Sequence, residues 1–226
     1  WKNWKAGLLR VLYYRALENM SGGAEAGAAV ARLGQRVAEA KAAMAARFKS
    51  SQGPHPTPWM ESALALHLER GAPAYWLAFP ADDLARHALL IAEAERAGRA
   101  LVVEARANPE RAVTEVTVYT PDNPGLFAAL AGAFALAGAN VVDARITTLA
   151  NGMALDVFSI QDMDGNAFAD ADRMARLTHR IKDTLSGKTS SRRELETARG
   201  RTQTARLGAF TVPPRVLIDN KASASN

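Results

Sequence analysis

The sequence has no cysteine, and its 226 residues contain no apolar stretch of membrane-spanning length. Without thiols, disulfide scaffolds, cysteine-ligated zinc and thiol catalysis are excluded. A spanning helix needs about 18 or more apolar residues in a row, so no integral membrane protein is predicted. The sequence starts with neither a methionine nor the apolar core of a signal peptide. We therefore expect a cytoplasmic protein, and this start suggests a segment of a longer chain.

Aromatic residues are also scarce, at 7% of the chain, whereas alanine supplies 47 residues, about a fifth. Alanine favours helix but buries little apolar surface. The hydrophobic fraction of 48% therefore overstates the material for a core. The length still permits one large or two small domains, and the ordinary charge content excludes wholesale disorder.

The net charge of +5 is unevenly distributed. Residues 112–185 sum to −4, whereas residues 1–111 sum to +4 and residues 186–215 to +5. This distribution argues against one continuous basic binding face. The basic stretch could contact nucleic acid, but no aromatic residues alternate with its arginines, so a solvated tether is the favoured interpretation. These arginines are Arg192, Arg193, Arg199, Arg201 and Arg206.

The first hundred residues have helical periodicity. Helices are expected over 1–20, 24–48, 59–70 and 82–97, with a proline-rich linker over 50–58. The apolar stripe of the second helix consists of Val30, Leu33, Val37, Met44 and Phe48.

The period changes to that of β-strands after residue 100. Strands are expected over 100–105, 113–120, 140–149, 153–161 and 210–218, and helices over 125–137 and 170–185. From residue 112 the order is β-α-β-β-α-β, which is the ferredoxin-like arrangement of an α+β protein. The strands at 100–105 and 210–218 compete for one sheet edge, and the sequence does not decide between them.

The segment 119–127 joins a strand to a helix through a tight turn. Free N–H groups at the start of that helix would suit the carboxylate of an amino acid, and Gly125 would allow close approach. The alternative is an ordinary turn capped by Asp122 or Asn123. On chemistry alone, we favour the ordinary turn.

Several ordered stretches resemble a known family. Residues 114–127, 138–146 and 151–162 resemble an ACT domain, in particular the first ACT domain of the bifunctional uridylyltransferase/uridylyl-removing enzymes that modify the PII nitrogen-signalling protein. Residues 1–13 resemble the end of their HD phosphohydrolase domain and 75–87 their connector. Residues 210–220 resemble the approach to their second ACT domain.

The resemblance implies a domain organisation. It places an HD-domain tail at 1–50 and a helical connector with a short strand at 51–110. An ACT domain follows at 111–220, with a basic linker at 186–208, and a second ACT domain begins at 221–226.

The resemblance also implies an amino-acid site at the turn and, across a groove, at the start of the next strand. In many ACT domains such a site forms only between two domains. The implied residues are Asp122, Asn123, Pro124, Gly125, Leu126, Asn140 and Val141.

The implied function is glutamine sensing that sets the balance between uridylylation and deuridylylation of PII. No catalytic or metal-binding residue is expected here, because the chain has neither a Gly-Ser nor a His-Asp dipeptide. No cofactor is therefore expected in this chain, and magnesium would serve the catalytic parts of the full-length enzyme. His67 and His87 are expected to be packing or surface residues.

Two other functions stay open at this stage. One is a stand-alone ACT adaptor that binds an amino acid and a protein partner. The other is a nucleic-acid-binding protein that uses the basic linker. The resemblance also leaves room for a homodimer formed through ACT sheets.

Overall fold

The computed structural model describes residues 12–14, 24–51 and 57–187. Its helical part consists of α2 (Ala24–Ser51), α3 (Pro58–Arg70), α4 (Pro73–Ala78) and α5 (Ala81–Arg96). Its second part consists of β1 (Val102–Asn108), the 3-10 helix η1 (Pro109–Arg111), β2 (Val113–Pro121), α6 (Leu126–Leu136), β3 (Asn140–Arg145), β4 (Met153–Gln161) and α7 (Ala171–Leu185). The predicted α+β fold, with a helical part before an ACT-like sheet, is confirmed.

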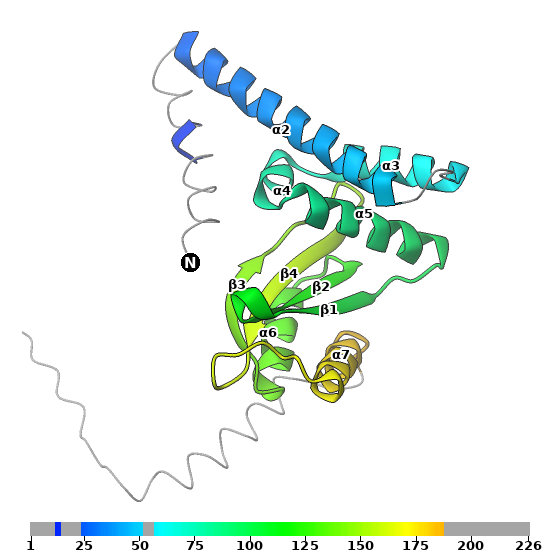
Figure 1. The fold of residues 1–226 in the computed structure, drawn as a ribbon, viewed down its shortest axis with the longest axis vertical. Coiled ribbons are helices and arrows are strands. Elements are labelled where there is room, and N and C mark those ends of the chain that lie inside the picture. Colours follow the sequence, from blue (N-terminus) through cyan, green and yellow to red (C-terminus); the bar gives the residue numbers. More distant parts are fainter. Residues whose placement is uncertain (1–11, 15–23, 52–56, 188–226) are drawn as a thin grey trace, which may run out of the picture.

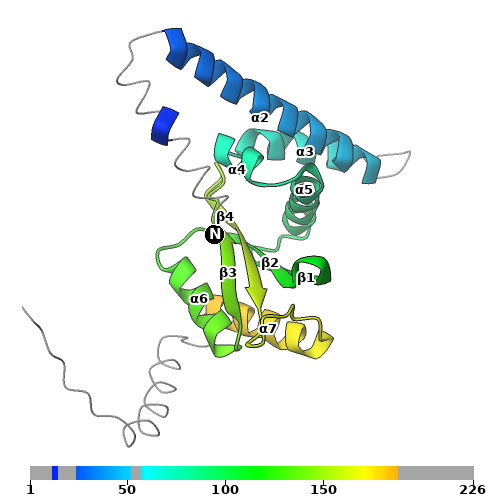
Figure 2. The ribbon, with the colours of Figure 1, turned by 60° about the vertical axis from the view of Figure 1, so that its left-hand side comes forward.

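The four strands form one antiparallel sheet in the order β1-β2-β4-β3. The central strands β2 and β4 run from the pair Thr114–Ile160 to the pair Pro121–Met153. Helices α6 and α7 cover one face, and the layer α2–α5 covers the other (Figure 1). Figure 2 shows the same sandwich closer to edge-on.

The sheet edge beside β2 is occupied by β1, which pairs with β2 along its whole length. The competition left open by the sequence is thereby resolved in favour of the earlier strand, which runs from residue 102 to 108. The described elements from β2 to α7 follow the predicted order β-α-β-β-α, and β1 precedes them at the sheet edge. The strand expected at 210–218 lies outside the described residues.

Both faces of β2 are buried, although its alternating sequence predicts a half-buried strand. Val116 and Val118 pack under α6 and α7. Thr117 and Tyr119, on the opposite face, are each only 1% exposed. The prediction was wrong because the helical layer covers the second face, and strand periodicity carries no information about a cover supplied by distant residues.

The helices begin and end close to the predicted positions. Proline stands in the first turn of α3 and α4, where its missing N–H costs nothing. Asp170 caps α7 by accepting a hydrogen bond from the N–H of Arg173. The short helix α4 was not predicted, because six residues are too few to show a helical period.

Helix α2 packs through its C-terminal half only. Met44 and Phe48 are buried in the helical layer, whereas Val30 in the first half is 52% exposed. Of the sequence segments with predicted roles, most of 1–20, nearly all of 186–208 and all of 210–226 lie outside the described residues. Among the helices that are described, none is long and apolar enough to cross a membrane.

Candidate functional site

The turn between β2 and α6 has a backbone that requires glycine. Gly125 has a φ of 87°, in the left-handed region that side chains other than glycine rarely adopt. The space above it is open, since an added Cβ would meet no atom within 4 Å. Residues 122–125 are exposed, and Leu126 is half-buried. An open loop thus precedes the first turn of α6, whose N–H groups lie at the positive end of the helix dipole.

The loop at 122–125 is held by the turn between β3 and β4. The Asp122 N–H donates to the Gly152 carbonyl at 3.0 Å. The Thr148 hydroxyl donates to the Asp122 carboxylate at 2.6 Å. The Asn123 amide donates to the Pro121 carbonyl at 3.4 Å. These bonds fix the loop, and they engage one carboxylate oxygen of the exposed Asp122.

Asn140 and Val141 lie at the opposite end of the sheet from this loop. Asn140 pairs with Gln161, the last residue of β4. Pro121, which precedes the loop, pairs with Met153, the first residue of β4. Because β4 has nine residues, the two ends are about 26 Å apart at 3.3 Å per residue. One chain therefore does not bring the two halves of the predicted site together. Both Asn140 and Val141 are exposed on the edge strand β3.

Asp156 is a buried carboxylate near the loop that sequence reasoning missed. It lies opposite Val118, is 1% exposed, and accepts the Thr147 N–H at 3.3 Å. Burial raises the pKa of Asp156 to about 6; the Thr147 hydrogen bond lowers this pKa, and the Asp122 carboxylate raises it. The sequence feature that could have identified Asp156 is an aspartate at an inward-facing position of a mostly apolar strand.

The two histidines that were expected to be packing or surface residues are both buried. His67 and His87 are each 1% exposed. The Tyr75 hydroxyl lies between them, 3.0 Å from His67 Nε2 and 3.4 Å from His87 Nδ1. Burial lowers the pKa of His67 to about 4 and that of His87 to about 3, with further lowering by Arg70 and Arg86 respectively.

No metal centre is found within the described parts of the chain, which hold no group of three or more metal-ligating side chains. The described residues therefore offer no ligand set for the magnesium that the resemblance implies for the full-length enzyme. The aspartate-rich segment 162–166, which faintly resembles a calcium loop, is a turn. Asp162 Oδ1 accepts the N–H groups of Asp164 and Asn166.

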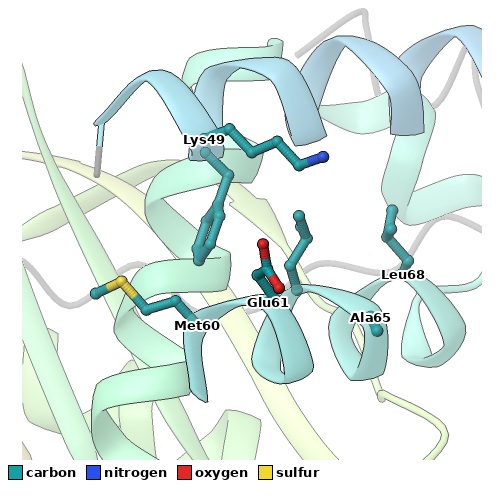
Figure 3. Close-up of a pocket in the computed structure, with 7 residues that line it drawn as sticks. Lys49, Met60, Glu61, Ala65 and Leu68 are labelled. Atoms are coloured by element: carbon teal, nitrogen blue, oxygen red, sulfur yellow. The ribbon is translucent and has the colours of Figure 1, made fainter. Parts of the chain in front are cut away.

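A pocket of about 350 Å³ lies elsewhere, between the end of α2 and α3 (Figure 3). Its lining is mostly apolar, with Lys49 and Glu61 as the charged residues. It is built by the helical layer alone and shares no residue with the predicted amino-acid site. Nothing in its lining converges on a polar ligand, so it is not the candidate site.

The four-stranded antiparallel sheet, two helices on one face and the glycine turn after a central strand define an ACT-like domain. Over its full length the chain matches a segment of the bifunctional uridylyltransferase/uridylyl-removing enzymes. It is 45% identical to the enzyme of Azospirillum brasilense and 39% identical to that of Rhodospirillum rubrum, each over 100% of this chain. It is 41% identical to the enzyme of Gluconobacter oxydans over 99% of the chain. The resemblance seen in the sequence is thereby confirmed.

The chain spans only 22–23% of the length of these relatives. No family model matches it. No solved structure matches it either.

Proposed function

We propose that this chain is the glutamine-sensing regulatory segment of a bifunctional enzyme that uridylylates and deuridylylates PII in the cytoplasm. The observation that carries the proposal is the full-length match to uridylyltransferase/uridylyl-removing enzymes. The glycine turn at 122–125 supplies a ligand site that suits a regulatory role. Catalysis, PII binding and magnesium would belong to the remainder of the longer relatives.

The loop offers partners for both charged groups of an amino acid. The Leu126 N–H already donates to the Asn123 carbonyl at 3.1 Å. The N–H groups that follow it in the first turn of α6 would bind the ligand carboxylate, since helix N-termini stabilise anions. The Asp122 carboxylate, already held by Thr148 on one oxygen, would accept the ligand ammonium. A charge-assisted hydrogen bond of this kind contributes about 1.5–3 kcal/mol.

Asn140 and Val141 join this site when two ACT-like sheets meet edge to edge. Strand β3 has a neighbour on one side only, so its other side is open in the described sheet. A second sheet pairing antiparallel there would bring its own position 140 to the end of the first sheet that carries the loop at 122–125. The exposed apolar side chains of Phe127, Val141 and Ile146 on this side favour such a contact. The second sheet is either another copy of the chain or a following ACT domain.

Titration calorimetry with glutamine tests this function on the chain and on a form extended through the second ACT domain. Binding is expected in at least one form. Asp122→Asn should weaken it at least about tenfold, which corresponds to 1.4 kcal/mol. Asp164→Asn, the same change in an exposed turn at the far end of the sheet, should leave it unchanged. Absence of binding in both forms refutes glutamine sensing, and equal binding by Asp122→Asn places the ligand elsewhere.

A further inference from the structure

A polar contact links the ligand-loop end of the sheet to the helical layer. Glu95 Oε1 on α5 accepts two hydrogen bonds, from Arg70 Nη1 on α3 at 2.6 Å and from the Tyr119 hydroxyl on β2 at 3.0 Å. The Asn151 amide in the β3–β4 turn donates to the Tyr119 hydroxyl at 3.5 Å. We call these four residues the joint.

The joint is shielded from water on one side. Tyr119 is 1% exposed, and the side chains of Arg70 and Glu95 are 19% and 35% exposed. Glu95 is an exposed residue, but Arg70 is largely covered, so their ion pair is screened by salt less than a pair that lies fully in water. Burial raises the pKa of Tyr119 to about 12, which keeps its hydroxyl a donor to Glu95.

A second set of bonds ties the same turn to α3. The Ala150 N–H donates to the Arg70 carbonyl at 3.0 Å. Leu149 is 2% exposed and packs in the same cluster as Tyr75 and Trp76. The Trp76 indole N–H in turn donates to the Gly71 carbonyl. In both views the end of the β3–β4 turn meets the helical layer (Figures 1 and 2).

The other side of this turn holds the ligand loop. Thr148 and Gly152 bind Asp122, and Tyr119 lies three residues before it on β2. The turn at 146–152 therefore contacts the loop on one side and α3 on the other. Movement of Asp122 toward a ligand would shift Thr148 and, through the same short turn, Ala150 and Asn151.

We propose that the joint transmits occupancy of the loop at 122–125 to helices α3 and α5, a coupling that rests on the glutamine site proposed above. The ligand changes the position of the turn, and the joint transfers that change to the C-terminal ends of both helices. Energetic coupling of this kind needs a contiguous element that both sites bias. Arg70, Glu95, Tyr119 and Asn151 supply it here.

Amide hydrogen exchange of the chain with and without saturating glutamine tests the coupling. In the native chain, glutamine should slow exchange in peptides from the loop and from the ends of α3 and α5. Tyr119→Phe and Glu95→Gln should keep the loop protection and glutamine affinity within about threefold, but lose the helix protection; couplings are typically fivefold or more. Glu93→Gln, an equal charge change on an exposed α5 position, should keep both. Helix protection retained in both joint variants overturns the proposal.

A ligand-free measurement decides the coupling even if glutamine does not bind. Thr148→Val removes the hydrogen bond to Asp122 without touching the helices. It should speed amide exchange at the end of α3 by about fivefold in the native chain, the lower end of ordinary couplings. In the Tyr119→Phe background it should not. Equal acceleration in both backgrounds, or none in the native chain, refutes the joint, whereas loss of glutamine binding alone refutes only the proposed function.

Discussion

The face of the sheet under α6 and α7 is buried mainly by aliphatic and phenylalanine side chains, whereas the face under α3–α5 also buries histidines, tyrosine and tryptophan. The first core contains Val116, Phe134 and Phe158. The second contains Tyr75 and Trp76 and is bordered by the joint. Apolar packing is non-directional and tolerates small shifts, but hydrogen-bonded groups fix a geometry. Both faces bury apolar side chains, and the second adds the hydrogen-bonded contact that we propose transmits a shift.

The largest expected effect is the loss of the apolar core. Phe158→Ala removes a fully buried ring that contacts Phe134 at a centroid distance of 4.9 Å. Such truncations cost about 3–5 kcal/mol. Urea unfolding followed by circular dichroism should show this loss.

Unfolding of Phe158→Ala should also involve both faces together, because β2 and β4 contribute to both cores. Fluorescence of the tryptophans and circular dichroism should therefore give one midpoint. Separate midpoints for the two signals would show that the helical layer folds independently of the sheet.

Acid should act on the helical layer through its two buried histidines. The folded-state pKa values of about 4 and 3 lie below the ordinary 6.5, so folding favours the neutral rings. Their contribution is complete above pH 6.5 and is lost as the pH falls toward 4 and then 3. Between pH 7 and 5 the free energy of unfolding should fall by about 2 kcal/mol per histidine, at 1.36 kcal/mol per pKa unit.

Urea midpoints at several pH values check this acid effect. His179→Gln is the matched control, because the side chain of His179 is 77% exposed, and its profile should follow that of the native chain. Replacement of both buried histidines by glutamine should abolish the loss of stability between pH 7 and 5 and leave the opposite, smaller change that Asp156 contributes. An unchanged slope in that double variant would place the acid-sensitive groups elsewhere.

The apolar face should respond to pH in the opposite direction through Asp156. Its folded-state pKa of about 6 is above the ordinary 3.8 of an aspartate, so folding favours the protonated acid. Its stabilisation is present at low pH and is lost as the pH rises through 6. Relative to Asp156→Asn, the free energy of unfolding of the native chain should rise by about 1.4 kcal/mol when the pH falls from 8 to 5.

The difference in unfolding free energy between native chain and Asp156→Asn isolates this carboxyl, because the histidines contribute equally to both. Asp170→Asn is a poor control, since Asp170 caps α7. The exposed Asp164 is a better one. A flat difference between pH 8 and 5 would show that Asp156 is ionised in the folded chain throughout that range.

Local sequence patterns predict the elements but not the contacts between them. The strand at 153–161 and the helices α3, α5, α6 and α7 were predicted to within a few residues, because periodicity and caps are local. The second cover of β2 and the joint were missed, and the edge position of β1 was left open between two strands. Each hydrogen bond of the joint connects residues at least 24 positions apart in the sequence. No sequence period connects residues that far apart. For the candidate site, the sequence predicted the exposed loop at 122–125, but it gave no indication of the buried Asp156 beside it.

The smallest expected effect lies on the surface of the helical layer. Arg47 and Asp82 form an ion pair at 3.1 Å, but their side chains are 61% and 74% exposed. Exposed pairs contribute about 0–1 kcal/mol, because water screens them and two long side chains lose freedom. Asp82→Asn should therefore shift the urea midpoint by less than Glu95→Gln, which removes the charge that Arg70 and Tyr119 share in the joint. Measured in 0.5 M salt, the two variants should separate further, because salt screens exposed charges more strongly than partly buried ones. Equal effects of the two substitutions at low and high salt would mean that the joint is no more specific than a surface pair.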